Sequence, residues 1–384
     1  MPQSDVSRRR RPSSAGRALE VSGPIRVVVM PKDANPYQRL LYEEVASAGG
    51  EIRYAEGPSW SHTINLLVAP LMLAAYRLRG YRILHIHWVF QFSLPWAARV
   101  SMARRVMQWW FWFYLWWAGL LGYRIVWTAH DLLPHEQVFS DDRRARGYLI
   151  RRAGTVIALS TASVTDLVEL GARDVIVIPH GSFVEPYPRT LGRPEARKGL
   201  GFGDDDIVVL LIGRIERYKG ADILLEAVTS LQTSSPVKVV VAGACRDAAY
   251  RAVLSELALR AGKRAVVRLE RIPDAEMAAY LEAADFAVFP FRAITNSGSV
   301  QLAQSFGLPV LIPKLASLSD VPDEAALRYD PGTRSLAQAL ERAAQMSEEA
   351  RSKMGRAGKQ FADAMDWSTA ARLHMDAYSK LLND

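Results

Sequence analysis

Residues 206–227 read DIVVLLIGRIERYKGADILLEA, and this stretch decides the fold of the chain. Its first part, 206–212, is a run of aliphatic residues that predicts a buried strand. Gly213 and Gly220 enclose a short polar segment, and an apolar helical pattern begins near Asp222. A strand that passes through a glycine turn into a helix is the repeating unit of a parallel sheet. We therefore expect an α/β protein in which this turn lies at the carboxyl end of a strand.

The same alternation of short strands and longer helical segments fills the rest of the chain. The further strand candidates are 25–30, 52–54, 82–86, 124–128, 154–159 and 175–178 in the first half, and 237–242, 265–269, 285–289 and 309–312 in the second. Two such series predict two Rossmann-like, doubly wound parallel-sheet domains that face a cleft. The expected division is a disordered basic leader 1–23, an N-terminal domain 24–190, a linker 191–205 rich in Pro and Gly, a C-terminal domain 206–365 and a C-terminal helix 366–384.

Composition excludes several classes of protein. Of the 384 residues, 49% are hydrophobic and 23% are charged, which is typical of a globular protein and excludes a disordered one. The single cysteine, Cys245, excludes an internal disulfide framework. The leader carries arginines but no apolar run, so we expect no secretory signal and a cytoplasmic location.

The net charge of +8 lies entirely in the first half of the chain. Residues 1–190 hold 23 Lys and Arg against 15 Asp and Glu, and the remainder holds 25 of each. This asymmetry indicates an anionic partner for the N-terminal domain, either nucleic acid or a membrane surface.

Nine of the ten tryptophans also lie in that half, and most of them are in one segment. Residues 106–122 read VMQWWFWFYLWWAGLLG, an uncharged run that is short for a membrane span and is followed by a core strand. Aromatic residues beside arginines favour a helix that lies in the membrane surface, although a buried core helix is the simpler alternative. A nucleic-acid site would interleave aromatic and charged residues instead. The residues assigned to the membrane surface are Trp109, Trp110, Trp112, Trp116, Trp117, Arg104 and Arg105.

A second apolar segment, 65–76, is followed by Arg77 and Arg79. It is a further candidate for a membrane-facing helix, but on its own the segment favours an ordinary core helix.

The glycine turn after the strand at 206–212 predicts a phosphate site. Gly213 lets backbone amides approach an anion, and Arg214 and Lys219 add charge-assisted hydrogen bonds at a helix start. A solvated turn with two surface cations is the alternative.

Polar residues follow the strand at 285–289 as well. Hydroxyls and amides gathered at a helix start bind oxyanions, and they also serve as helix N-caps. The candidates for contact with such an anion are Thr295, Asn296, Ser297, Gly298 and Ser299.

A third candidate segment follows the strand at 124–128. His130, Asp131 and Glu136 are residue types suited to acid/base chemistry or to contact with sugar hydroxyls. His85 and His87 lie on one strand face and could join His130 and His135 in a metal site, but the spacing matches no familiar metal motif, so we expect none.

The segment GRIERYKGADILLEA resembles the donor-diphosphate segment of GT-B glycosyltransferases of the family-4 type. The segments 177–181 (VIPHG), 285–290 and 307–310 (GLPV) resemble other parts of the frame around the donor site, and the likeness covers roughly 25–384. It is specific in the second half of the chain and vague in the first.

The resemblance implies that Arg214 and Lys219 hold the donor diphosphate and that His130 stands at the family's cleft histidine. Gly213 and His180 would line the same cleft. The family's pair of glutamates is absent, because Ile294 and Leu302 occupy those positions. The sequence Thr-Asn-Ser-Gly-Ser at 295–299 instead resembles the Ser-Gly loop of β-mannosyltransferases of the lipid-linked pathway.

The expected function is therefore a glycosyltransferase on the inner face of the cell membrane. It would move a hexose from a GDP- or UDP-sugar to a lipid-linked or saccharide acceptor, without metal or other cofactor. A sugar-nucleotide epimerase or hydrolase of the same fold is one alternative, and a nucleic-acid- or membrane-binding protein without enzymatic activity is another. A nicotinamide enzyme is disfavoured because no G-x-G-x-x-G follows the first strand.

Overall fold

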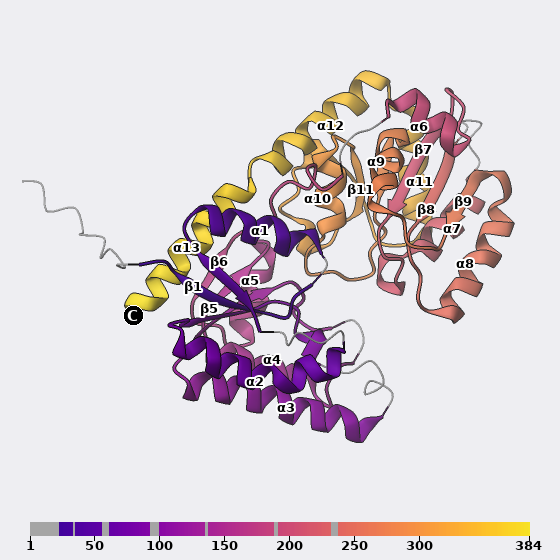
Figure 1. Cartoon of the computed structure of the whole chain (residues 1–384). Coiled ribbons are helices and arrows are strands. Elements are labelled where there is room, and N and C mark those ends of the chain that lie inside the picture. The colour runs from indigo at the N-terminus through magenta and orange to yellow at the C-terminus, as the bar shows by residue number, and fades with distance from the viewer. Residues whose placement is uncertain are drawn as a thin grey trace, which may run out of the picture.

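Two six-stranded sheets, each with a helical layer on both faces, make up the protein (Figure 1). The computed structural model describes residues 23–33, 35–55, 61–92, 100–134, 137–187, 191–231 and 237–384. The strand orders are β2-β1-β3-β4-β5-β6 and β12-β11-β10-β7-β8-β9, and neighbouring strands are parallel throughout. This architecture confirms the expected pair of doubly wound α/β domains.

The N-terminal sheet is formed by aliphatic strands with helices packed on each face. Its strands are β1 (Arg26–Met30), β2 (Glu51–Tyr54), β3 (Ile83–Ile86), β4 (Arg124–Ala129), β5 (Ala153–Ala158) and β6 (Val175–Val177). One face is covered by α1 (Pro36–Ser47) and α13 (Trp367–Asn383). The other is covered by α2 (His62–Leu78), α3 (Ser101–Leu120), α4 (Asp142–Arg152) and α5 (Ala162–Glu169).

The C-terminal sheet has the same layered construction. Its strands are β7 (Ile207–Ile212), β8 (Val237–Ala242), β9 (Ala265–Arg268), β10 (Phe286–Val288), β11 (Val310–Pro313) and β12 (Ala326–Tyr329). One face carries α6 (Arg193–Leu200), α9 (Asp274–Ala283), α10 (Gly298–Ser305) and α12 (Glu348–Asp363). The other carries α7 (Ala221–Thr229), α8 (Ala248–Ala261) and α11 (Thr333–Gln345).

Every strand candidate from the sequence is present, with ends that differ by a residue or two. One strand was not predicted, β12, which pairs on one side with β11. Its four residues read ALRY and include no β-branched side chain, so the composition that marked the other short strands is missing.

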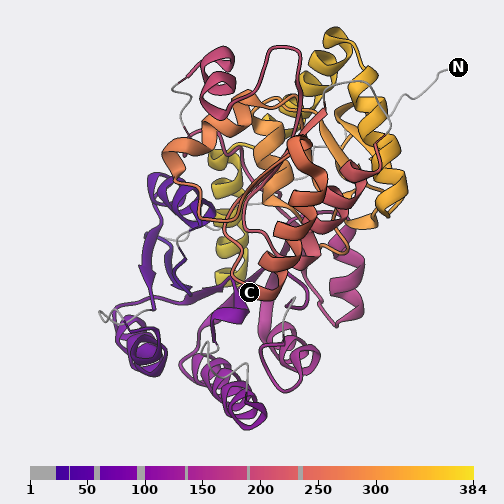
Figure 2. The ribbon, with the colours of Figure 1, turned by 90° about the vertical axis from the view of Figure 1, so that its right-hand side faces the viewer.

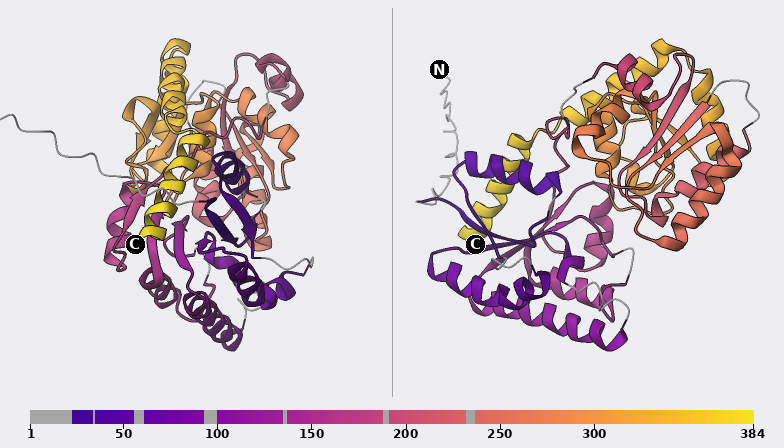
Figure 3. Two further views of the ribbon diagram at one scale, coloured as in Figure 1. Left: turned by 60° about the vertical axis from the view of Figure 1, so that its left-hand side comes forward. Right: turned by 45° about the vertical axis from the view of Figure 1, so that its right-hand side comes forward.

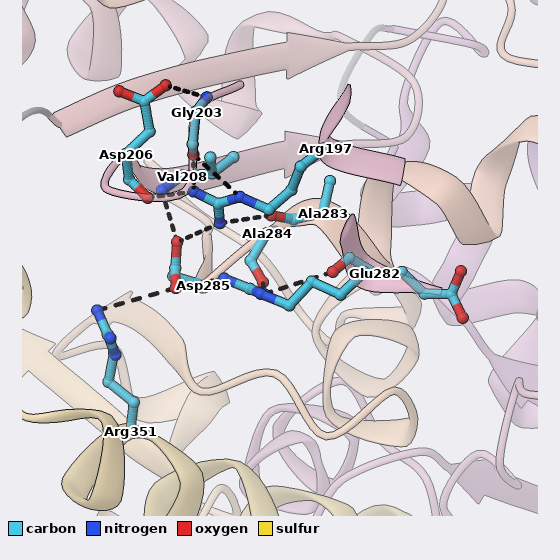
Figure 4. Close-up of polar contacts among 10 residues, drawn as sticks. Arg197, Gly203, Asp206, Val208, Glu282, Ala283, Ala284, Asp285 and Arg351 are labelled. Carbon is cyan, nitrogen blue, oxygen red and sulfur yellow. Dashed lines mark hydrogen bonds and ion pairs between the residues drawn. The ribbon is translucent and has the colours of Figure 1, made fainter. Parts of the chain in front are cut away.

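The predicted linker 191–205 differs from expectation because it contains a helix. Pro194 occupies the first turn of α6, and Gly201 ends it in the left-handed conformation with φ 79°. Arg193 and Arg197 of this helix reach the carboxylate of Asp285, which immediately precedes β10 (Figure 4). The helix is therefore part of the C-terminal domain.

The C-terminal helix crosses from one domain to the other. The chain leaves the C-terminal domain through α12, and α13 then packs beside α1 of the N-terminal domain (Figures 1 and 3). Trp367 at its start donates its indole N–H to the carbonyl of Ser182 at 2.6 Å, and Lys380 pairs with Asp174 at 3.0 Å. The predicted leader lies almost wholly outside the described residues, which begin at residue 23.

Candidate active site

The two domains meet where the strands of each sheet end. After β10, the Asn296 side chain donates to the carbonyl of His130, which follows β4. The same side chain contacts Nε2 of His180, beyond β6, at 3.3 Å. The amide of Leu132 donates to the Thr295 hydroxyl at 3.4 Å. Four residues predicted from separate motifs are thus brought together at the domain interface.

A second group of predicted residues lies at the carboxyl end of β7. The Lys219 ammonium donates to the hydroxyl of Ser299 at 3.1 Å. Gly213 adopts φ 109°, and a Cβ there would lie 3.0 Å from the Lys219 nitrogen and 3.3 Å from the Ser299 oxygen. A side chain at this position would therefore be strained and would crowd both polar groups. We call Gly213, Lys219 and Ser299 the cation site.

Lys219 is buried, with 7% of its surface exposed, although it carries a charge. Among the described residues, no carboxylate lies within ion-pair distance of its ammonium. Burial lowers the pKa of Lys219 to about 8, and the nearby charge of Glu216 opposes that shift. A buried ammonium with no carboxylate in contact is costly, so the site is suited to an anion.

Arg214 lies beside the cation site but in a different environment. Its side chain is 63% exposed and its guanidinium lies 3.7 Å from Glu216. Its positive charge also contributes to lowering the pKa of Lys219. The structure thus places one predicted phosphate ligand inside the protein and the other at its surface.

The start of α10 supplies further donors next to Lys219. Ser297 is the N-cap, and its hydroxyl accepts from the amide of Val300 at 3.2 Å. Gly298 and Ser299 form the first turn, where amides lack partners within the helix. The positive end of the helix dipole is therefore directed toward the region around the cation site.

His130 is held rigidly on the other side of the interface. Its ring stacks on Trp88 with centroids 4.2 Å apart, and the Tyr37 ring meets it edge-on at 4.8 Å. Burial lowers the pKa of His130 well below its usual value, so the imidazole is neutral near pH 7. The sequence analysis missed Tyr37 and Trp88 as site residues, and their positions after β1 and β3 were the available signal.

Asp131 follows His130 and is half-buried. Its charge opposes the burial that lowers the pKa of the Arg146 guanidinium to about 10. Arg146, on α4, also donates to the carbonyl of Leu132 at 3.1 Å. No pattern in the sequence separates this buried arginine from its exposed neighbours. Glu136, the other predicted acid, lies outside the described residues.

Three of the four histidines of the metal alternative lie in the described residues, and His135 lies outside them. His85, His87 and His130 use ring nitrogens in hydrogen bonds with hydroxyls or with one another. Within the described ranges, no three His, Cys, Asp or Glu side chains gather in a way that would hold a metal ion.

The tryptophan-rich segment forms α3, and the five tryptophans lie in two environments. Trp109 and Trp116 are 68% and 45% exposed. Trp110, Trp112 and Trp117 pack against the core, where Trp117 donates to the carbonyl of Pro70 at 3.0 Å. Arg105 is exposed, whereas Arg104 is partly buried and donates to Gln137. In the part of the chain that is described, no helix is both long and apolar enough to cross a membrane.

Two doubly wound domains that meet at their strand ends, with a cation site at one of those ends, define a protein of the GT-B fold. Residues 192–361 match the family described as Glycosyl transferases group 1. These residues, less than half of the chain, are thus a domain of this family, and the activity that it indicates is that of a glycosyltransferase.

Relatives and solved structures agree with this assignment. The D-inositol 3-phosphate glycosyltransferase of Corynebacterium aurimucosum is 24% identical over 99% of this chain and 87% of its own. The enzyme of that name from Streptomyces scabiei is 26% identical over 93% of this chain and 78% of its own. Sucrose-phosphate synthase from Thermosynechococcus elongatus superimposes with a TM-score of 0.73 at 19% identity, over 94% of this chain and 99% of that one. HepE of Anabaena in complex with UDP gives 0.68 at 17% identity, over 93% and 100%.

Proposed function

We propose that the protein transfers a hexose from a nucleotide sugar whose diphosphate binds at the cation site. The observation that carries this proposal is the buried ammonium of Lys219, which donates to Ser299 and contacts no carboxylate of the described residues. A diphosphate would supply the missing negative charge. The similarity to HepE, whose structures hold UDP and UDP-glucose, supports UDP as one candidate nucleotide, with GDP as the other.

The reaction proceeds without a metal ion in this proposal. Negative charge grows on the leaving diphosphate, and the Lys219 ammonium, the exposed Arg214 and the amides at the start of α10 stabilise it. His130 is neutral and lies across the interface, where it contacts the sugar. If the product is inverted, Asp131 or Glu136 takes the acceptor proton. If configuration is retained, the leaving phosphate takes it.

The acceptor in this proposal is lipid-linked, because the N-terminal domain has an apolar face for a membrane. Helices α2 and α3 lie side by side at the end of the molecule away from the C-terminal domain (Figures 1 and 2). We define the α2–α3 face as the large apolar side chains that these helices expose. They are Ile64, Leu67, Leu71, Leu78, Met102, Val106, Trp109, Phe113, Trp116 and Leu120.

The spacing of these residues makes one continuous stripe on each helix. On α3 they recur at intervals of three and four, which keeps them on one side of the helix while the opposite side enters the core. Exposed apolar area on this scale marks an interaction surface. Arg79 and Arg105 are exposed on or beside the same helices and would add about 1 kcal/mol each on an anionic leaflet. The charge complementarity favours the inner face of the cell membrane.

Donor binding and transfer test the first part of the proposal. Thermal shifts with UDP-, GDP- and dTDP-sugars would identify the donor, because a ligand that binds only the folded state raises Tm. Transfer to a lipid-linked acceptor should fall about a thousandfold in Lys219→Met. The matched control is Lys238→Met, because that ammonium contacts only the carbonyl of Lys263 at the surface. Equal turnover in the two variants contradicts the assignment.

The same assay separates the alternative enzymes. A transferase should release little free sugar when no acceptor is present, whereas a hydrolase or an epimerase would turn the donor over alone. Rapid acceptor-independent turnover would replace the proposed reaction with one of these.

Vesicle flotation tests the membrane part. The protein should bind vesicles that contain anionic lipid, in a salt-sensitive manner, and should not bind an oligonucleotide. Trp109→Ser combined with Trp116→Ser should reduce binding at least tenfold. Leu259→Ser is the control, because this exposed leucine lies on α8 of the other domain. Binding that the double variant leaves unchanged would rule out the α2–α3 face as the docking surface.

A further inference from the structure

Behind His130, a chain of buried hydrogen bonds runs through the N-terminal domain to the C-terminal helix. Nε2 of His130 lies 3.0 Å from Nδ1 of His87, and Nε2 of His87 lies 2.6 Å from the Tyr42 hydroxyl. That hydroxyl lies 2.9 Å from Nδ1 of His85, and the Tyr378 hydroxyl reaches the same nitrogen at 2.6 Å. The chain thus joins α1, the end of β3, the end of β4 and α13.

The members of this chain are neutral because they are buried. His85 and Tyr378 are completely buried, and His130, the most exposed member, has 8% of its surface accessible. Burial lowers the pKa of His85, His87 and His130 well below the usual value and raises that of Tyr42. Each imidazole therefore carries one N–H and one lone pair, and its partners decide which nitrogen holds the proton.

The far end of the chain fixes the order of these protons. Nε2 of His85 lies 2.8 Å from the Thr128 hydroxyl, and its Nδ1 faces two tyrosine hydroxyls. Bonds from O–H donors are shorter than bonds from N–H donors, so the 2.9 Å contact fits an N–H at Nδ1 of His85 that donates to Tyr42, and the 2.6 Å contact fits a Tyr42 hydroxyl that donates to His87. Tyr42 then donates to Nε2 of His87, which leaves the proton of that ring on Nδ1.

The consequence for His130 follows directly. The N–H at Nδ1 of His87 points to Nε2 of His130, so Nε2 accepts and the proton of His130 lies on Nδ1. Within the described residues, the ring of His130 makes its hydrogen bond through Nε2, which is committed to His87, and Nδ1 is the nitrogen left for a ligand. The stacked Trp88 and the edge of Tyr37 hold the ring plane.

We propose that His87 and Tyr42 are positioning residues that hold His130 as the neutral Nδ1–H tautomer. Resting on the proposed function, this assigns His130 the role of a hydrogen-bond donor to a sugar or phosphate oxygen. It also removes His130 from the candidate general bases, because the nitrogen with the lone pair is already occupied. With the reversed proton order, Nδ1 of His130 would carry a lone pair, and it would accept a hydrogen bond or a proton instead of donating one.

The tautomer can be measured without any assay of transfer. In long-range ¹H–¹⁵N spectra of protein labelled with ¹⁵N-histidine, the signal lost in His130→Gln identifies His130. The expected pattern has Nδ1 protonated and Nε2 unprotonated near pH 7. A protonated Nε2 would overturn the proposal. Because the spectra need no substrate, this result stands even if the proposed reaction is wrong.

Substitutions along the chain test the positioning role. Tyr42→Phe removes the donor to His87 and should shift the His130 signals toward the other tautomer. His87→Leu removes the donor to His130, and kcat/KM should fall about tenfold or more in both variants. His87→Asn retains an N–H close to the position of Nδ1 and should recover most of that loss.

His374→Leu is the matched control. His374 is equally buried and lies near His85, but its ring bonds the carbonyl of Ala370 in its own helix. The control should keep the wild-type kcat/KM and the wild-type His130 signals. If Tyr42→Phe and His87→Leu stay within twofold of wild type, or if His87→Asn is as poor as His87→Leu, the positioning role is refuted.

Discussion

Asp285 and Lys219 are buried charged side chains at opposite ends of the C-terminal sheet, and their surroundings differ. Asp285 precedes β10 and accepts from Arg193 at 2.6 Å, Arg197 at 3.2 Å and the amide of Val208 at 2.8 Å (Figure 4). Lys219 follows β7, and the only hydrogen-bond partner of its ammonium within the described ranges is the Ser299 hydroxyl. Arginines neutralise the Asp285 carboxylate, whereas the Lys219 ammonium contacts no carboxylate of the described residues.

This difference separates a structural cluster from a ligand site. The arginines around Asp285 come from α6 and, at 3.8 Å, from Arg351 of α12, so the carboxylate ties two helices to the sheet. Among the described residues, no carboxylate contacts the Lys219 ammonium, although burying its charge costs free energy just as burying the Asp285 carboxylate does. Ligands of parallel sheets bind beyond the carboxyl ends of strands, which is where the unpaired charge lies. Four changes would break or sharpen this contrast.

The largest effect is expected at Asp285. Asp285→Asn leaves the buried guanidinium of Arg197 without its counter-charge, and the free energy of unfolding should fall by about 3–5 kcal/mol. Urea denaturation followed by circular dichroism measures this. Asp323→Asn is the control, since that carboxylate pairs with Arg328 while 86% exposed and should contribute less than about 1 kcal/mol. A loss at Asp285 no larger than in the control would show that the cluster is not structural.

Lys219→Met should change stability in the opposite direction. In the ligand-free protein, burial lowers the pKa of the Lys219 ammonium to about 8. Replacing it with the neutral methionine side chain should therefore raise the free energy of unfolding by up to about 3 kcal/mol. This gain over wild type should vanish when both proteins are unfolded in the presence of a saturating nucleoside diphosphate, because only wild type binds and is stabilised by it. A variant less stable than wild type would mean that an internal partner already compensates Lys219.

Nucleotide binding should depend on pH through the same side chain. The folded pKa of Lys219 is below its unfolded value, so the destabilisation is complete below about pH 8 and disappears as the pH rises toward 10.5. Affinity for UDP or GDP should be constant between pH 7 and 8 and should fall by up to tenfold per unit above it. Titration calorimetry measures the constant at each pH. Lys219→Arg stays charged, so its nucleotide affinity should not vary with pH over this range. If the affinity of wild type does not vary either, Lys219 does not bind the anion.

Local sequence predicted the fold well because the core strands are continuous aliphatic runs between glycine turns. The turn at 213–220 also located the cation site, since its residue types alone indicate an anion. Sequence could not show that Lys219 is buried while Arg214 is exposed, because the short helical turn at Arg217–Lys219 sets their directions.

Contacts between distant segments were beyond the reach of local patterns. The hydrogen-bond chain behind His130 needs Tyr378, which is supplied by a helix that returns from the other domain. The exposed side of α2 was equally hidden, because 65–76 is apolar on both sides and only packing shows which one enters the core. Leu66 and Leu73 are buried there, whereas Leu67 and Leu71 are exposed.

The smallest effect separates two serines that the sequence could not distinguish. Ser297 caps α10 through Val300, so Ser297→Ala should cost about 1 kcal/mol of unfolding free energy. Ser299 instead bonds the Lys219 ammonium, so Ser299→Ala should weaken nucleotide binding about fivefold, an effect that Ser297→Ala should not have. Thermal melts and nucleotide titrations of both variants measure the two quantities. If each serine affected stability and nucleotide binding equally, the start of α10 would be one structural unit. The helix cap at Ser297 and the ammonium contact at Ser299 would then have no separate roles.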